Sequence, residues 1–309
     1  MVDSQVTLNK NKNGQINIVL HDRENVIVEK NEYFKEKQED PFKSIEQEFS
    51  SFIGMHNLKE TIKEIYANIH INQKREQVGL KCQKQVLHML FKGNPGTGKT
   101  TVARKLANLF YDMNVLSKGH FIEAERADLV GEYIGHTAQK TRDLVEKAIG
   151  GVLFIDEAYS LARGGEKDFG KEAIDTLVKQ MEDRSNDFIL ILAGYPNEME
   201  RFLSLNPGLK SRFPITLDFD DYSVDQLLKI ANQMMMEREY QLTEEAESKL
   251  RDYLTRKKQS YPSHFSNARF IRNSIEKSIR KHAVRLMQRQ QYTTKDLTLI
   301  TKNDLTLVD

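Results

Sequence analysis

The chain has 309 residues, of which 39% are hydrophobic and 29% charged, with a formal net charge of +1. This composition indicates a globular protein with an ordinary core, and the charge provides no global attraction to nucleic acid or anionic membranes. The single cysteine, Cys82, excludes an internal disulfide. The polar N-terminus lacks the apolar core of a secretion signal, and the apolar runs are too short to span a bilayer. We therefore expect a cytoplasmic protein without membrane insertion.

Residues 1–40 differ in composition from the rest of the chain. The segments Ile16–Leu20 and Asn25–Val28 are predicted to pair as a hairpin around a polar turn. Residues 29–40 are densely charged and indicate a linker. This N-terminal extension carries no recognisable chemistry, and it suits a partner-binding arm as well as a poorly ordered extension.

Residues 41–222 alternate between helical and strand patterns. Two helices are predicted near residues 44–52 and 58–78, followed by short apolar strands separated by amphipathic segments. Strands that are apolar throughout, at such spacing, indicate a parallel sheet covered by helices on both faces. The predicted strands are 86–91, 121–124, 152–155, 188–193 and 215–219.

Helical periodicity dominates beyond Tyr222. The segments 223–240, 243–257 and 266–289 are predicted helices, and the last carries an apolar stripe of Ile271, Ile275, Ile279 and Leu286. We expect residues 223–309 to form a helical subdomain behind the α/β domain.

Residues 93–100 match the phosphate-binding motif G-x-x-x-x-G-K-[ST] and lie between a predicted strand and a helix from Thr101. Its glycines let successive N–H groups surround an anion at a helix N-terminus. Lys99 is placed to reach the β and γ phosphates, and the Thr100 hydroxyl to ligate Mg²⁺. The motif therefore predicts a nucleoside triphosphate site formed by Gly93, Asn94, Pro95, Gly96, Thr97, Gly98, Lys99, Thr100 and Thr101.

A second motif follows the apolar strand 152–155, where the carboxylates of Asp156 and Glu157 are consecutive. A protein core excludes two such carboxylates unless they coordinate a ligand. Asp156 suits Mg²⁺ coordination, and Glu157 can orient and polarise a water against the γ-phosphate.

Together the motifs at 93–100 and 153–157 and the helical subdomain resemble an AAA+ ATPase, over about residues 45–300. The resemblance implies a P-loop sheet with a helical lid, ATP and Mg²⁺ as ligands, and a homo-oligomeric ring, typically a hexamer. It places Ile53-Gly54 against adenine and Arg212 as an arginine finger toward the neighbouring subunit. It makes Arg269 the second sensor in the lid. The first sensor departs from the usual asparagine, because Tyr195 stands near its place and Asn197 follows two residues later.

The segment after the second core strand resembles the central pore loop of the family. Tyr133-Ile134 forms an aromatic–aliphatic pair, flanked by Gly131 and Gly135. An exposed aromatic ring can grip an unfolded chain, whereas local packing of Tyr133 is the plainer alternative. Residues 168–170 are a candidate second pore loop.

The segments 132–137 and 154–161 are typical of the CbbX/CfxQ branch of the family. Residues 124–128 and 164–171 are similar to members from spore-forming bacilli, which implies a role in spore maturation. We therefore expect a ring ATPase that remodels a protein client, which the sequence does not identify.

Three rival functions have some support. Asp128–Gly131 and Thr301–Asp304 fit two GTPase motifs, but their context differs from that of a GTPase. The helix over 269–289 carries seven Lys or Arg against one acid, which is a possible nucleic-acid surface. A non-hydrolysing scaffold is disfavoured because Glu157 and Arg212 are both present.

Overall fold

The computed structural model describes residues 5–10, 16–21, 40–82, 85–133, 135–163, 169–260 and 265–307. The chain divides into two units, Met1–Lys43 and Ser44–Asp309, and the limits predicted from the sequence stay predictions. Among the described residues, no helix combines the length and the apolarity needed to cross a membrane.

In the first unit, β1 (Gln5–Lys10) pairs antiparallel with β2 (Ile16–His21). The strand predicted over residues 16–20 is present, and its observed partner β1 is a strand that the sequence did not indicate. The pairing predicted with residues 25–28 stays a prediction. The register joins Val6 to Leu20 and Leu8 to Ile18. Residues 25–28 and the charged stretch 29–39 lie outside the described residues.

The second unit contains a five-stranded parallel sheet, as predicted. Its order is β4-β5-β6-β3-β7. Every residue of β5 and β6 is buried, because helices cover both faces, whereas the edge strand β7 alternates between buried and exposed residues. The strands are β3 (Met89–Gly93), β4 (Phe121–Ala124), β5 (Val152–Ile155), β6 (Ile189–Gly194) and β7 (Ile215–Phe219).

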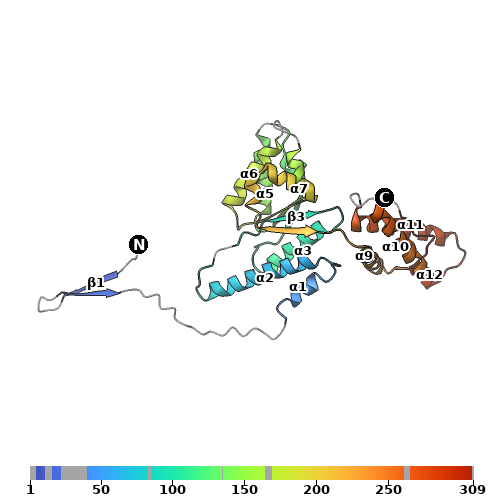
Figure 1. Cartoon of the computed structure of the whole chain (residues 1–309), viewed down its shortest axis with the longest axis horizontal. Helices are drawn as coiled ribbons and strands as arrows, with labels where there is room; N and C mark the ends of the chain where they lie inside the picture. Colours follow the sequence, from blue (N-terminus) through green and yellow to red (C-terminus); the bar gives the residue numbers. More distant parts are fainter. Residues whose placement is uncertain are drawn as a thin grey trace. The chain divides into compact units, whose positions relative to one another are not determined.

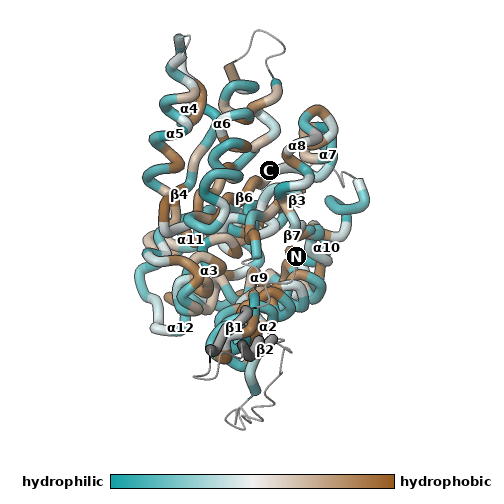
Figure 2. Tube along the Cα trace, turned by 90° about the vertical axis from the view of Figure 1, so that its left-hand side faces the viewer, coloured by the Kyte–Doolittle hydropathy of each residue, from teal (hydrophilic) through white to brown (hydrophobic). Residues whose placement is uncertain are grey.

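Helices lie on both faces of this sheet (Figure 1). Helices α2 and α3 cover one face, and α5, α6 and α7 cover the other. In Figure 2 the tube of α5 changes between hydrophilic and hydrophobic colours along its turns, as expected for a helix with one buried face. The helices are α1 (Lys43–Glu48), α2 (His56–Gln77), α3 (Lys99–Asp112), α4 (Arg126–Leu129), α5 (His136–Ala148), η1 (Ala158–Ala162), α6 (Gly170–Asp183), α7 (Pro196–Leu205) and α8 (Pro207–Lys210).

The C-terminal part is helical and has its own core, around Leu227, Leu250, Phe270 and Ile275. Ser223 begins its first helix with a capping box to Gln226. A short parallel pair, β8 (Gln241–Leu242) and β9 (Leu299–Ile300), joins two of its loops, and the sequence indicated no strand at β8. The helices are α9 (Val224–Met236), α10 (Glu244–Ser260), α11 (Asn267–Met287) and α12 (Thr294–Thr298).

Candidate nucleotide site

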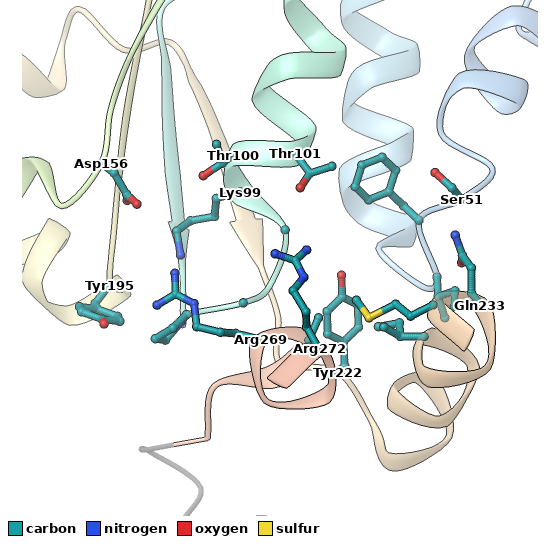
Figure 3. A pocket seen from close by; sticks show the side chains of 18 of the residues that line it. Ser51, Lys99, Thr100, Thr101, Asp156, Tyr195, Tyr222, Gln233, Arg269 and Arg272 are labelled. Carbon is teal, nitrogen blue, oxygen red and sulfur yellow. The ribbon is translucent and has the colours of Figure 1, made fainter. Parts of the chain in front are cut away.

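A cavity of about 470 Å³ lies at the carboxyl end of the sheet, between the α/β core and the helical part (Figure 3). Parallel strands deliver the residues that follow them to this edge, and here β3, β5 and β6 do so. The predicted site residues that line it are Ile53, Pro95, Gly96, Gly98, Lys99, Thr100, Thr101, Asp156, Glu157 and Arg269.

The loop between β3 and α3 has the geometry of an anion cradle. Gly98 has a φ of 98° directly before the first residue of α3, so the helix N-terminus opens into the cavity. The Lys99 Nζ donates to the carbonyl oxygens of Gly93 at 2.7 Å and Asn94 at 2.9 Å. Burial lowers the pKa of Lys99, while the carboxylate of Asp156 acts in the opposite direction.

Three predicted loop residues support the cradle from behind and do not line the cavity. A Cβ on Gly93 would lie 2.6 Å from the Cβ of Phe219, so only glycine fits under β7. Thr97 is fully buried, and its hydroxyl donates to the carbonyl oxygen of Asn94 at 2.8 Å. The Asn94 amide donates to both carboxylate oxygens of Asp221, at 3.0 and 3.1 Å.

Asp156 and Glu157 stand where β5 ends. The Glu157 N–H donates to a carboxylate oxygen of Asp156 at 2.9 Å, and Glu157 itself has a φ of 47°. A non-glycine residue in this left-handed region marks a constrained turn, which here leaves the Glu157 carboxylate exposed at the cavity.

The residues present fit a magnesium ion bound with a triphosphate. The Thr100 hydroxyl and the Asp156 carboxylate are hard oxygen donors that line the same cavity. No cluster of three His, Cys, Asp or Glu side chains suited to a metal exists in the described part of the chain. Mg²⁺ is usually bound by one or two protein oxygens together with phosphate oxygens and water, so a sparse donor set is suitable.

Only one residue of the predicted adenine-binding pair, Ile53 and Gly54, lines the cavity. Ile53 lines the cavity, together with Ile230 and Met234 of α9, and these apolar groups can contact a base. Gly54 does not line the cavity, and its φ of 73° and the Gln226 side chain 2.2 Å from where a Cβ would be favour glycine there.

The residue in the place of the first sensor is Tyr195. It follows β6, lines the cavity and packs against the ring of Tyr159 at 5.8 Å between centroids. Asn197 is exposed on α7 and is not among the lining residues. Tyr159, which the sequence reasoning missed, is 3% exposed, and burial together with the nearby Glu157 raises the pKa of its hydroxyl.

Two arginines of α11 reach into the cavity, although the sequence reasoning found only one. Figure 3 shows Arg269 directed toward Lys99 and Arg272 directed toward the side of Thr101. The positive charge of Arg269 contributes to lowering the pKa of Lys99, which places the two cations near each other. The spacing of three residues on one helix puts both side chains on the same face, and this signal could have identified Arg272.

Arg212 does not line the cavity. Its guanidinium donates to the carboxylate of Glu182 on α6 and, at 2.6 Å, to the carbonyl oxygen of Gly208. The side chain keeps 26% of its surface exposed. Within one chain, this arginine is therefore separate from Lys99, Asp156 and Arg269.

The predicted pore loop precedes α5. Tyr133 is 65% exposed and contacts the His136 ring edge to face, so it is not packed into the core. Gly135 has a φ of 83° at the start of α5, and Ile134 lies outside the described residues. Gly131 has a packing role, because a Cβ there would lie 2.6 Å from the Cβ of His136.

The candidate second pore loop is only partly described, since residue 168 lies outside the described residues. Phe169 precedes the first residue of α6, and Gly170 is buried against the carbonyl oxygen of Leu161.

The residues behind two rival functions have structural partners. Asp304 is 1% exposed, accepts from the Thr301 N–H and hydroxyl, and pairs with Arg285, so it is not free to read a guanine. Of the basic residues predicted on this helix, Arg269 and Arg272 face the cavity, and Arg289, which follows the end of α11, pairs with Asp296. These contacts leave fewer cations of α11 for a nucleic-acid surface.

The fold and the cavity define a P-loop nucleotide-binding protein with a helical lid, and comparison with known proteins extends this. Residues 89–221 match the model of the ATPase family associated with various cellular activities (AAA), and residues 223–308 match the AAA lid domain. The AAA domain of FIGL-1 in complex with ADP superposes with a TM-score of 0.55 over 83% of this chain and 81% of that chain. At 18% identity, this likeness concerns the fold.

Curated relatives are much closer in sequence. The chain is 62% identical to stage V sporulation protein K of Bacillus subtilis (strain 168), over 99% of this chain and 98% of the relative. It is 46% identical to protein CbbX of Cereibacter sphaeroides, over 76% and 75% of the two chains. It is 43% identical to the chloroplastic ribulose bisphosphate carboxylase/oxygenase activase of Cyanidioschyzon merolae, over 82% and 87%. The chain belongs to the CbbX/CfxQ branch of the AAA+ ATPases, as the sequence motifs predicted.

Proposed function

We propose that this chain is a Mg²⁺-dependent ATPase that assembles into a ring, typically a hexamer in this family. The ring remodels a protein client through its Tyr133 loops. We place this activity in the cytoplasm, in sporulation. The support for sporulation is the 62% identity to stage V sporulation protein K. The client belongs to the proposal only as a class, a protein with a segment that can enter a pore.

The side chains of the cavity divide the hydrolysis between them. Glu157 orients a water and accepts its proton as the water attacks the γ-phosphate. Lys99 and Arg269 offset the negative charge that builds on the phosphate oxygens, and Tyr195 lies within the same cavity as Glu157. Thr100 and Asp156 would hold a magnesium ion, and its charge would offset part of the negative charge of the triphosphate.

The observation that carries the ring proposal is the position of Arg212. It lies outside the cavity of its own chain and remains partly exposed, beside the carboxylate of Glu182. An arginine finger supplied by a second molecule contributes about 10³–10⁵ in rate. Because each 1.36 kcal/mol corresponds to a factor of ten, this is roughly 4–7 kcal/mol of barrier. A solitary chain should therefore be almost inactive.

Mixing two inactive variants tests whether the site is shared. Arg212→Ala should bind ATP but lose about 10³–10⁵ in turnover, and Glu157→Gln should bind ATP without cleaving it. In an equimolar ring, a chain with an intact Glu157 has a neighbour with an intact Arg212 half of the time. Steady-state ATPase of the mixture should therefore recover to about a quarter of the wild-type value. Mixed rings that stay inactive would refute a shared site.

Replacement of Tyr133 tests the pore. Tyr133→Ala should abolish the stimulation of ATPase by an unfolded test polypeptide such as casein, because the exposed ring is the proposed grip. Tyr111→Ala is a control, since Tyr111 is also exposed and lies on α3. If Tyr133→Ala responds to the polypeptide as the wild type does, the proposed role of this loop is excluded.

A further inference from the structure

Each of the four residues Asn94–Thr97 of the phosphate loop is hydrogen-bonded to the junction between core and lid. The Asn94 amide donates to Asp221, and the Pro95 carbonyl oxygen accepts from the Asn267 amide at 3.3 Å. The carbonyl oxygen of Gly96 accepts from the Ala268 N–H at 3.1 Å. The carbonyl oxygen of Thr97 accepts from the Tyr222 hydroxyl at 3.2 Å. The residues that should surround the phosphates are thus attached to this junction along their whole length, and Pro95 and Gly96 are attached to α11 of the lid itself.

Asn267 is at the centre of these contacts. Its side-chain oxygen accepts from the Tyr222 N–H at 3.1 Å, and its amide donates to Asp221 at 2.7 Å as well as to Pro95. The residue is fully buried and has a φ of 47°. Asparagine tolerates this left-handed backbone better than most residues, and its amide has the two donors and one acceptor that these contacts require.

The backbone of the loop also approaches the lid closely. A Cβ on Gly96 would lie 2.2 Å from the carbonyl oxygen of Ser266 and 2.7 Å from the backbone nitrogen of Arg269. Burial raises the pKa of the Tyr222 hydroxyl to about 12, so this group remains a hydrogen-bond donor at neutral pH. The contact is buried and close, so a displacement of α11 must displace the loop or break buried hydrogen bonds.

We propose that Asn267, with Asp221, is a positioning residue that couples the orientation of the lid to the shape of the phosphate loop. Asn267 does not line the cavity, and it acts through the loop and through Arg269, two residues further along α11. By linkage, a nucleotide that orders the loop should order the lid, and a lid held in place should raise nucleotide affinity by the same factor. The proposal rests on the proposed nucleotide site.

The substitution Asn267→Gly tests the contribution of the Asn267 side chain without changing the backbone conformation at this position. Glycine adopts the left-handed conformation readily, so this variant deletes the amide and keeps the turn. Asn114→Gly is the matched control, because Asn114 also has a positive φ, of 57°, and does not line the cavity. Thermal unfolding followed by circular dichroism would establish that both variants are folded.

The decisive readout is the distance between core and lid without nucleotide. Spin labels would be placed at exposed Lys147 and Arg280 after replacement of Cys82 by serine, and their distance distribution measured by pulsed EPR. We expect a single narrow distribution for the background and for Asn114→Gly, and a broadened one for Asn267→Gly. ADP affinity should fall about tenfold in Asn267→Gly, as for the loss of buried hydrogen bonds to a charged partner.

Unchanged distributions and unchanged ADP affinity in Asn267→Gly would overturn the proposal. If that variant fails to fold, Asn94→Ala removes only the contact to Asp221 and should broaden the distribution to a lesser degree, and no broadening there would also overturn it. The EPR measurement without ADP does not require nucleotide binding. If the wild-type chain did not bind ADP, the proposed function would be refuted. The coupling of lid and loop could still be measured by EPR.

Discussion

Arg269 and Arg212 are the same kind of side chain in two different situations. Arg269 enters the cavity of its own chain, close enough to Lys99 to affect its pKa. Arg212 lies outside that cavity and is paired with Glu182. The comparison suggests a division of labour in which nucleotide binding needs one chain and nucleotide cleavage needs two. Under the proposed function, one chain supplies the groups that hold a triphosphate, whereas the last charge for its cleavage comes from another copy.

The largest effect on nucleotide affinity should follow from Lys99→Ala, which acts within one chain. Loss of this cation removes a charge that offsets the phosphates and the carboxylates of Asp156 and Glu157, so ATP affinity should fall by more than about 100-fold. Titration with a fluorescent ATP analogue measures this. Lys147→Ala, at the exposed end of α5, is a control for the loss of a lysine. Near-normal affinity of Lys99→Ala would remove the phosphate loop from the site.

A smaller loss of nucleotide affinity is expected from Arg272→Ala, which also acts within the cavity of one chain. Arg272 reaches the cavity beside Thr101, so its loss should weaken ATP and ADP by a similar factor of about ten. Calorimetric titration with each nucleotide would show this. The control is Arg280→Ala, two turns further along α11 and outside the cavity. Equal affinities of the two variants would mean that Arg272 makes no contact with nucleotide.

The smallest effect should come from Glu182→Gln, on the side of Arg212. An exposed ion pair contributes at most about 1 kcal/mol, so release of Arg212 should change ring ATPase by no more than about fivefold. Turnover should rise, because Arg212 no longer has to leave a carboxylate. Asp183→Asn, an exposed neighbour on α6, is the control. A loss as large as that of Arg212→Ala would contradict a holding role for Glu182.

Much of the fold followed from local pattern. The strands β5 and β6 were predictable because a run of apolar residues of that length fits a strand covered on both faces. The pairing of Ile16–His21 with the strand before it was not predicted, because strand preference does not choose a partner. The site residues Arg272 and Tyr159 were missed, since neither belongs to a contiguous motif and only the packing of α11 and η1 brings them to the cavity.

The sequence by itself determined the phosphate cradle, the carboxylate pair after β5 and the membership of the AAA+ family. Their chemistry depends on consecutive residues whose geometry is set by one turn of backbone. Only the tertiary structure decided that Tyr195 rather than Asn197 reaches the cavity, that Arg212 does not, and that Asn267 joins the lid to the loop. These contacts join residues that are far apart in the chain, and the packing of core against lid fixes their distances.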